Sequence, residues 1–191
     1  MITEPKIKVV LFDFFGVLST PAYKQAIDHY FPDAERREWM RKLDPLDLGE
    51  LSEEDLIREI AQAAGVGEQE VRNFAFEAPA LNAPLIEFIA KYLKPVMRVG
   101  IFTNIQRPIL ERIMGKTLDL FDIQLVSSDL KLLKPSKEIF EVAIKRCGVS
   151  SNEILFIDDL ELNVAAAHES GMQSFKYEDL SSCVAGIRSR I

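Results

Sequence analysis

The stretch KVVLFDFFGVL, residues 8–18, decides the fold of this chain. Residues 8–12 begin with Lys8 and continue as an uninterrupted run of β-branched, leucine and aromatic side chains. A run without polar alternation predicts a strand that is buried on both faces, at the centre of a parallel sheet. The run stops at Asp13, and Gly16 gives the backbone the freedom for a sharp turn. The stretch therefore places a carboxylate at the end of a central strand.

The residues from about 20 to 79 carry helix signals only. We predict helices over residues 21–30, 33–43, 52–64 and 68–76. The third of these opens on Ser52 followed by Asp55, a pair that resembles a capping box. Four helices with no strand between them predict a small helical bundle that is inserted into the fold and is not part of the sheet.

Beyond residue 79, helix and strand signals alternate again. We predict strands over residues 96–102, 123–126, 153–157 and 173–177. We predict the helices between and before them over residues 85–93, from about 108 to 114, from about 136 to 147 and from about 160 to 170. This alternation predicts an α/β fold, a doubly wound, Rossmann-like parallel sheet. We expect residues 1–18 and 80–191 to form the core domain and residues 19–79 to form the helical insertion.

The composition is that of a globular protein, with 48% hydrophobic and 28% charged residues in a chain of 191. The net charge of −7 argues against binding to the nucleic-acid backbone, which needs an excess of lysine and arginine. No apolar run reaches the length of a membrane span, and the run near the N-terminus contains Asp13. We expect a cytoplasmic protein, a monomer or homodimer, without membrane or nucleic-acid partners.

Polar side chains follow most of the predicted strands. They are Asp13, Thr103, Asn104, Lys134, Asp158 and Asp159. The C-terminal ends of parallel strands meet at one edge of the sheet, where ligands bind in open α/β folds. Mg²⁺ takes carboxylate oxygens together with waters and phosphate, which matches three carboxylates at this edge. A carboxylate can also attack phosphorus and form an aspartyl-phosphate.

Taken alone, each of these signals has a structural explanation. The pairs Thr103-Asn104 and Asp158-Asp159 are residue types that cap helix N-termini. Lys134 precedes Pro135 and is typical of a solvated turn. The functional interpretation gains weight because the signals occur in order, each after the right kind of element.

The same residues resemble the four motifs of the haloacid dehalogenase-like (HAD) hydrolase superfamily. DFFGVL (13–18) is similar to the first motif and IFTN (101–104) to the second. Lys134 in KPS (134–136) is similar to the third motif, and FIDD (156–159) with Asn163 to the fourth. The match extends over almost the whole chain. The helical insertion directly after the first motif resembles the small, C1-type cap of subfamily I members.

The resemblance implies a role for each residue. Asp13 would be the nucleophile that attacks the phosphoryl group of a small phosphorylated metabolite. Thr103 and the backbone amide of Asn104 would bind that group, and Lys134 would neutralise its charge and that of Asp13. The groups that would hold Mg²⁺, directly or through another ligand, are Asp13, the backbone carbonyl of Phe15, Asp159 and Asp158. Phosphoryl transfer depends chiefly on such positioning and charge neutralisation.

One position departs from the pattern of the superfamily's phosphatases, which commonly carry a second aspartate two residues after the nucleophile as general acid and base. Phe15 stands there in this chain. A phenyl ring can neither protonate a leaving group nor activate a water. The missing contribution is about 10²–10⁴-fold in rate, roughly 3–5 kcal/mol of barrier.

Three interpretations stay open. The enzyme handles good leaving groups, such as those of anomeric sugar phosphates or acyl phosphates, or uses an acid from the insertion. Alternatively, it is a 2-haloacid dehalogenase, although that branch usually has tyrosine at position 15 and lacks a pair like Asp158-Asp159. The third is a weakly active or non-catalytic phosphate-binding protein. A second departure, Lys131 where relatives often have glycine, affects the loop that carries Lys134.

The insertion is expected to supply the substrate contacts. Candidates are Tyr23, Lys24, His29, Arg36, Arg37 and Trp39. By its ordinary pKa, His29 is a candidate for the missing acid. We expect the insertion to move as a lid about residues 17–20 and 78–83.

Overall fold

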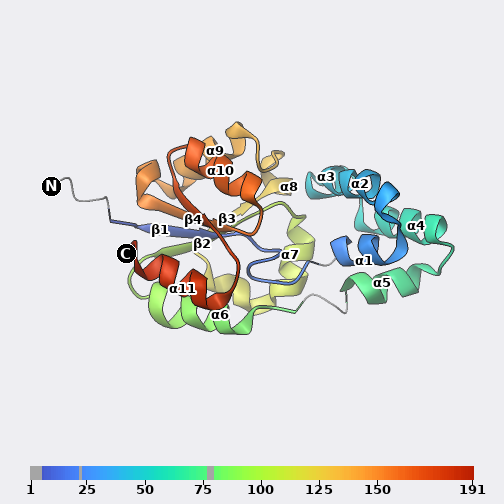
Figure 1. Cartoon of the computed structure of the whole chain (residues 1–191), viewed down its shortest axis with the longest axis horizontal. Coiled ribbons are helices and arrows are strands. Elements are labelled where there is room, and N and C mark those ends of the chain that lie inside the picture. Colours follow the sequence, from blue (N-terminus) through green and yellow to red (C-terminus); the bar gives the residue numbers. More distant parts are fainter. Residues whose placement is uncertain (1–5, 22, 77–79) are drawn as a thin grey trace.

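The computed structural model describes residues 6–21, 23–76 and 80–191. Five parallel strands form one sheet in the order β3-β2-β1-β4-β5 (Figure 1). The strands are β1 (Val9–Phe12), β2 (Arg98–Thr103), β3 (Ile123–Val126), β4 (Ile154–Asp158) and β5 (Gln173–Lys176). The chain leaves β1 toward β3 on one side and returns to β4 on the other, which confirms the doubly wound sheet.

Helices cover both faces of the sheet. The helices α6 (Ala83–Phe88), α7 (Arg107–Met114) and α11 (Leu180–Arg188) contribute to one apolar cluster. The helices α9 (Lys137–Cys147) and α10 (Glu161–Glu169) contribute to a second cluster. In Figure 1, α9 and α10 lie above the sheet and α6 and α11 below it. The molecule therefore has the helix–sheet–helix layers that the alternating sequence predicts.

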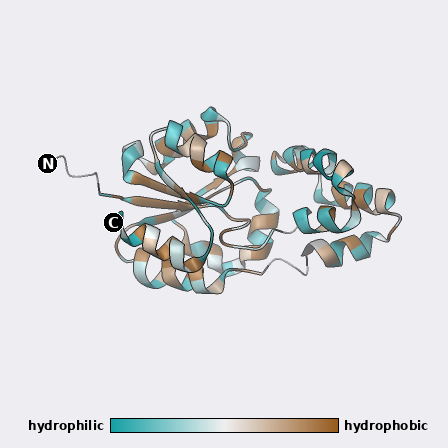
Figure 2. Ribbon diagram, in the orientation of Figure 1, coloured by the Kyte–Doolittle hydropathy of each residue, from teal (hydrophilic) through white to brown (hydrophobic). Residues whose placement is uncertain are grey.

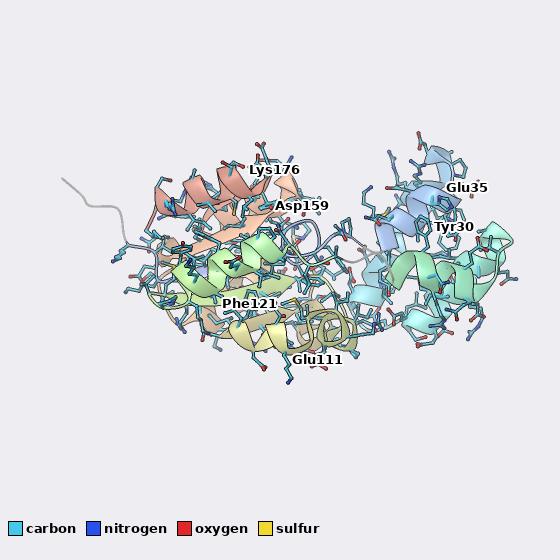
Figure 3. All side chains as sticks on the ribbon, turned by 90° about the horizontal axis from the view of Figure 1, so that it is seen from below. Tyr30, Glu35, Glu111, Phe121, Asp159 and Lys176 are labelled. Carbon is cyan, nitrogen blue, oxygen red and sulfur yellow. The ribbon has the colours of Figure 1, made fainter. Side chains whose placement is uncertain are left out.

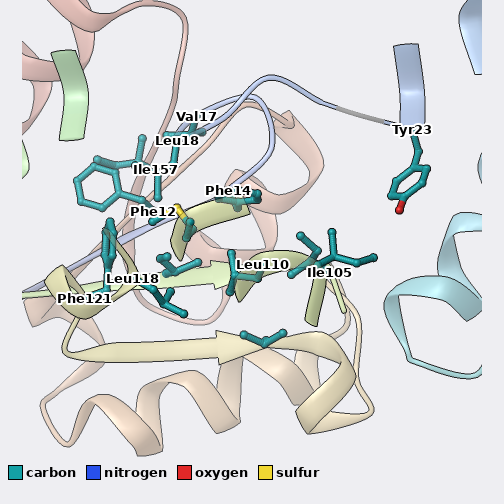
Figure 4. Close-up of a cluster of buried hydrophobic side chains, with 14 of the residues drawn as sticks. Phe12, Phe14, Val17, Leu18, Tyr23, Ile105, Leu110, Leu118, Phe121 and Ile157 are labelled. Carbon is teal, nitrogen blue, oxygen red and sulfur yellow. The ribbon is translucent and has the colours of Figure 1, made fainter. Parts of the chain in front are cut away.

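Strand β1 is buried on both faces, as its sequence predicts. Val10 and Phe12 belong to the cluster under α6, α7 and α11, whereas Val9 and Leu11 belong to the cluster under α9 and α10. Figure 4 shows part of the first cluster, and Figure 2 shows that hydrophobic residues fill the strands while the outer helices are mixed. Complete burial of one such large side chain contributes about 1.5–3 kcal/mol to folding.

The helices between β1 and α6 form a separate group, which we call the helical unit and which lies beyond the C-terminal ends of the strands (Figure 1). Its members are α1 (Tyr23–Tyr30), α2 (Asp33–Arg41), α3 (Leu43–Asp47), α4 (Glu53–Ala64) and α5 (Glu68–Phe76). The rest of the fold is the sheet unit. Buried side chains such as Ile27, Leu56 and Ile60 fill the interior of the helical unit and belong to the same apolar cluster as Val10 and Phe12 of the sheet unit.

Among the described residues, this unit has one more helix than the sequence predicts. The prediction over 33–43 covers α2 and the start of α3, and α3 then continues through Pro45, which sits in its first turn. The predicted capping box at Ser52 is partly confirmed, since the Ser52 hydroxyl accepts a hydrogen bond from the Asp55 amide at 3.1 Å.

Several short elements also lie outside the predictions. The predicted helix over 85–93 is α6 followed by a π-helical turn, η1 (Ile89–Leu93). The other unpredicted elements are α8 (Ser127–Leu130), α11 and the 3₁₀ turns η2 (Gly115–Leu120) and η3 (Ser151–Glu153). Apart from α11, which has nine residues, these pieces have three to six residues and are too short for a helical period to appear in the sequence. None of the described helices has the length and apolar character that a membrane span requires.

The two segments that join the units lie side by side. Ser19 forms an antiparallel bridge with Leu81. The Thr20 amide donates to the Ala80 carbonyl at 3.1 Å, and the Asn82 side chain donates to the Val17 carbonyl at 3.0 Å. These contacts lie within the predicted hinge segments 17–20 and 78–83, of which residues 78 and 79 are outside the described residues.

Candidate active site

A cavity of about 400 Å³ lies between the sheet unit and the helical unit. From the sheet unit it is lined by Asp13, Phe15, Thr103, Asn104, Lys134, Pro135, Asp159, Leu160, Leu162 and Asn163. The helical unit and its entry contribute Pro21, Tyr23, Lys24, Met40, Leu43, Asp44 and Asp47. All but one of the side chains predicted from the strand ends line this cavity, and the exception, Asp158, contacts Lys134 just beneath it.

Lys134 is the centre of the site. Its side chain is only 1% exposed, and its ammonium lies 2.9 Å from Asp13 Oδ1 and 2.6 Å from Asp158 Oδ2. A third proton is directed to the Phe102 carbonyl at 2.9 Å, so the three donors of the ammonium have three acceptors. Burial alone would lower the pKa of Lys134, but the two carboxylates outweigh it and hold that pKa above its ordinary value. These contacts therefore favour the charged form of Lys134.

The side chain of Asn104 fixes the backbone of Lys134. Asn104 Nδ2 donates to the Lys134 carbonyl at 2.9 Å, and Asn104 Oδ1 accepts from the Lys134 amide at 2.9 Å. This pair of bonds ties the end of β2 to the loop after α8. Sequence reasoning missed this role because the partner is a backbone group, which leaves no trace in residue type.

Asp158 is completely buried and is held by donors on several sides. Besides Lys134, its oxygens accept from the Leu160 amide at 2.9 Å and from Asn163 Nδ2 at 3.0 and 3.1 Å. Helix α10 begins only at Glu161, so Asp158 is not its N-cap residue. Its carboxylate contacts Lys134 as well as the Leu160 amide at the start of α10, so capping alone does not account for this residue.

Asp13, Asp158 and Asp159 bring carboxylate oxygens within 4.8 Å of one another. Gly16 makes this approach possible, because its φ is +85° and a Cβ built there would lie 2.3 Å from Asp159 Oδ2. Three hard oxygen donors beside an open cavity fit Mg²⁺, which takes few protein ligands and keeps waters. The donor set and the missing side chain at Gly16 are thus consistent with a magnesium site.

The carboxylates of the site are destabilised as anions by their surroundings. Burial raises the pKa of Asp13 to about 7, against the lowering effect of Lys134 and with a further increase from the charge of Asp158. Burial and the charge of Asp158 also raise the pKa of Asp159. A bound divalent cation would reverse this tendency by favouring both anions.

The helical unit supplies only part of the residues that its sequence suggested. Tyr23 and Lys24 line the cavity, as expected. His29 instead stacks on Phe74 with ring centroids 4.4 Å apart, and Trp39 stacks on Phe31 at 4.3 Å. The acidic residues Asp44 and Asp47 also line the cavity, although no sequence motif predicts them there. They belong to α3, the helix that the sequence did not predict.

The model of one protein family, described as haloacid dehalogenase-like hydrolase, matches residues 7–171. This chain belongs to the haloacid dehalogenase-like hydrolases. The match includes the sheet edge with Asp13, Thr103, Lys134 and Asp158. The family resemblance of the four motifs is thereby confirmed, and the chain is a hydrolase by family.

Solved structures share the fold. A predicted HAD-like family hydrolase from Porphyromonas gingivalis superposes with a TM-score of 0.76 at 23% identity, covering 97% of this chain and 98% of that one. A HAD family enzyme from Bacteroides thetaiotaomicron, in complex with magnesium and inorganic phosphate, gives 0.73 at 23% identity, covering 93% and 98%. An L-2-haloacid dehalogenase gives 0.64 at 19%, covering 92% and 88%.

One curated relative matches over only part of its length. The bifunctional epoxide hydrolase 2 of Rattus norvegicus is 26% identical over 121 residues, which are 60% of this chain and 22% of that protein. The chain thus matches about a fifth of the relative's length. This similarity and the structural likenesses support the fold.

Proposed function

We propose that this HAD-like hydrolase is a Mg²⁺-dependent phosphatase that acts on a small phosphorylated metabolite through an aspartyl-phosphate on Asp13. One observation carries the proposal: Lys134 is buried between Asp13 and Asp158, with its ammonium 2.9 and 2.6 Å from their oxygens. A buried cation held against a carboxylate at a cavity suits the charge that develops in phosphoryl transfer.

In this proposal Mg²⁺ is held by Asp13, Asp159 and the backbone carbonyl of Phe15. The close approach of Gly16 to Asp159 supports the last of these, because it brings the peptide after Phe15 next to that carboxylate. Asp158 acts mainly through Lys134 and Asn163, whose donors occupy both of its oxygens. When bound, the ion neutralises the phosphoryl oxygens and keeps Asp13 anionic.

The residues of the chain then have distinct tasks. An oxygen of Asp13 attacks phosphorus and displaces the leaving group. Thr103, buried at the end of β2, and the backbone amide of Asn104 bind the phosphoryl oxygens. Lys134 balances the negative charge and is fixed in place by the Asn104 side chain. Because these groups are already oriented by one another, little reorganisation is required during the reaction.

The helical unit would act as a cap that completes the substrate pocket, with residues 1–18 and 80–191 as core and 19–79 as cap. Met40 and Leu43 from the helical unit and Leu160 and Leu162 from the sheet unit line the cavity. These apolar walls suit the carbon skeleton of a metabolite, such as a sugar phosphate, with a single phosphoryl group at Asp13. We propose a cytoplasmic enzyme, monomer or homodimer, that acts without membrane or nucleic-acid partners.

A second candidate is a 2-haloacid dehalogenase-like hydrolase. The phenyl ring of Phe15 and the apolar walls of the cavity favour it, and a dehalogenase shares the fold. The magnesium-suited cluster of Asp13, Asp158 and Asp159 counts against it, since this reaction needs no metal. The retained cluster and Lys134 also count against a non-catalytic phosphate-binding protein.

The test is hydrolysis of p-nitrophenyl phosphate and acetyl phosphate by wild type and Asp13→Asn, with Mg²⁺ or EDTA. Both substrates have good leaving groups, so the missing acid at Phe15 matters least. We expect Mg²⁺-dependent release that falls at least about 10³-fold in Asp13→Asn. Asp119→Asn, at an exposed position on η2, is the matched control and is expected to behave as wild type.

Release that is no faster than in Asp13→Asn would overturn the phosphatase proposal. Halide release from a 2-haloacid in the presence of EDTA would instead establish the dehalogenase. Thermal stabilisation by Mg²⁺ and phosphate, with no turnover of either ester or of a haloacid, would establish the binding protein.

A further inference from the structure

Phe15 leaves the sheet unit without the acid that the proposed phosphatase needs. Its ring is partly buried and packs on Phe14 with centroids 4.9 Å apart, so it lines the cavity as an apolar wall. From the helical unit, Asp47, the last residue of α3, lines the same cavity, and its carboxyl group interacts electrostatically with Asp13 and Lys134. The missing group and a candidate replacement thus share one cavity.

We propose that Asp47 is the general acid and general base of this enzyme, taking the place of the aspartate that Phe15 replaces. The inference rests on the proposed phosphatase function. It identifies a catalytic residue that is contributed by the helical unit, opposite the nucleophile Asp13 and not adjacent to it in the sequence.

The segment that carries Asp47 is fastened to the sheet unit. The Ser127 hydroxyl donates to the Asp47 carbonyl at 2.6 Å, and Lys131 Nζ donates to the Leu48 carbonyl at 2.6 Å. Gln106 Nε2 donates to the Leu51 carbonyl, also at 2.6 Å. These three bonds come from residues just after β2 and β3, the strands that end at the site. Asp47 is therefore positioned relative to Asp13 by the sheet unit itself.

The surroundings of Asp47 favour a carboxyl group that keeps its proton. Burial raises its pKa to about 8, the charges of Asp44 and Asp13 add to this increase, and Lys134 opposes it. No hydrogen bond to its carboxyl oxygens contributes among the described residues. An acid with a pKa near the working pH can both donate and accept a proton, as a two-step mechanism requires.

Other titratable groups at the cavity are less suited to this role. The Tyr23 hydroxyl donates to Glu53, and burial with the charge of Glu53 raises the pKa of Tyr23 far above its ordinary value. Lys24 forms an ion pair with Asp28. The groups that face the cavity with Asp47 are Tyr23, Lys24, Asp44, Asp13, Lys134 and Asp159.

Asp47 alone can supply and take back the proton that the formation and the hydrolysis of the aspartyl-phosphate require. In the first step the bond from Asp13 to phosphorus forms, the bond from phosphorus to the leaving oxygen breaks, and Asp47 gives its proton to that oxygen. In the second step a water attacks phosphorus, the bond to Asp13 breaks, and Asp47 takes the proton of the water. The products are an alcohol and inorganic phosphate, and Asp47 is protonated again.

The test compares Asp47→Asn with wild type on an alkyl phosphate, which has a poor leaving group, and on p-nitrophenyl phosphate. We expect kcat/KM for the alkyl phosphate to fall by about 10²–10⁴-fold. The initial burst of p-nitrophenolate should persist, because that leaving group needs no proton, while the subsequent steady-state rate falls. Glu50→Gln, in the same segment but exposed, is the matched control.

The pH profile is a second readout. In wild type, kcat/KM for the alkyl phosphate should decline above about pH 8, where Asp47 loses its proton, and this limb should be absent from Asp47→Asn. Asp47→Glu keeps a carboxyl group and should recover part of the activity. If Asp47 were only structural, Glu would be no better than Asn.

Equal losses on both substrates, with the burst also gone, would overturn the acid role, and so would an unchanged rate on the alkyl phosphate. Either result leaves the phosphatase proposal standing as long as wild type turns over and Asp13→Asn does not. If wild type hydrolyses neither substrate, the phosphatase proposal fails, and the role of Asp47 fails with it.

Discussion

The sheet edge and the helical unit hold their polar groups in different ways. At the sheet edge, Lys134, Asp158 and Asn104 are each bonded to one another or to neighbouring backbone, and every bond stays within the sheet unit. The helical unit meets the sheet unit through separate bonds to the carbonyls of residues 47, 48 and 51 and through an ion pair between Arg112 and Glu53 at 2.7 Å. Figure 3 shows the two units as distinct bodies, with Asp159 on one and Tyr30 on the other.

This difference indicates that the sheet edge is the more rigid of the two regions. A network whose members orient one another is preorganised for charge stabilisation, and loss of one member affects all others. Single bonds to backbone carbonyls can break one at a time, so the helical unit can separate from the site without disturbing it. We infer that the sheet edge carries the phosphoryl transfer, and that the helical unit governs access and substrate choice and supplies the proposed proton donor.

The largest effect is expected from Lys134→Met, which breaks the network at its centre. The change leaves Asp13 and Asp158 buried without their cation, so the free energy of unfolding should fall by about 3–5 kcal/mol. Hydrolysis of p-nitrophenyl phosphate should fall by at least about 10²-fold. Urea unfolding and steady-state kinetics measure both. Lys137→Met removes an exposed lysine and should change stability by less than about 0.5 kcal/mol. Equal effects of the two changes would contradict the central role of Lys134.

The next effect is expected from Gly16→Ala, which displaces the Asp159 carboxylate from those of Asp13 and Asp158. The added Cβ would lie 2.3 Å from Asp159 Oδ2, so the carboxylate must move and Mg²⁺ should bind more weakly. The half-saturating Mg²⁺ concentration for activity measures this. Gly65→Ala is the control, because Gly65 also has a positive φ, +69°, but nothing lies within 4 Å of its added Cβ. Only the first variant should require more Mg²⁺, and a similar requirement in both would argue for backbone strain alone.

A smaller effect is expected from Asn104→Ala, which removes both bonds to the Lys134 backbone. Leaving those buried backbone groups unpaired should cost about 1–3 kcal/mol in stability. Activity should decrease through kcat more than through KM, because the ammonium of Lys134 is displaced while the phosphoryl site persists. Thermal unfolding and steady-state kinetics are the measurements. A change in KM alone would indicate that the Asn104 side chain contacts the substrate directly.

The smallest effect is expected from changes at Lys131, which tests one bond between the two units. This residue has a left-handed backbone, with φ of +55°, and its ammonium bonds to the Leu48 carbonyl. Lys131→Gly should remove roughly 1 kcal/mol of backbone strain and lose the bond, so stability should change little. Hydrogen exchange at residues 48–51 should nevertheless accelerate. Lys131→Ala loses the same bond but keeps the strain, so it should accelerate exchange and also lower stability.

The sheet and the strand-end residues were predictable because they depend on local patterns. The apolar run before Asp13 and the alternation after residue 79 follow directly from burial on two faces. The roles of Asn104 and Asp47 were not predictable. Asn104 bonds a backbone 30 residues away, and Asp47 acquires its pKa only when the helical unit buries it. Lys131 shows the same limit, since its departure from glycine was visible but its contact with Leu48 was not.

The paired connecting segments have a consequence for how such enzymes diversify. Ser19 and Leu81 are bridged, so the chain leaves the sheet and returns to it at nearly the same point. A segment inserted between such points costs the fold little more than the entropy of closing a loop, which grows slowly with length. Evolution or a protein engineer can therefore exchange the whole insertion and retain the nucleophile. In this chain, such an exchange would remove the proposed proton donor together with the substrate pocket, so a transplanted insertion must bring its own acid.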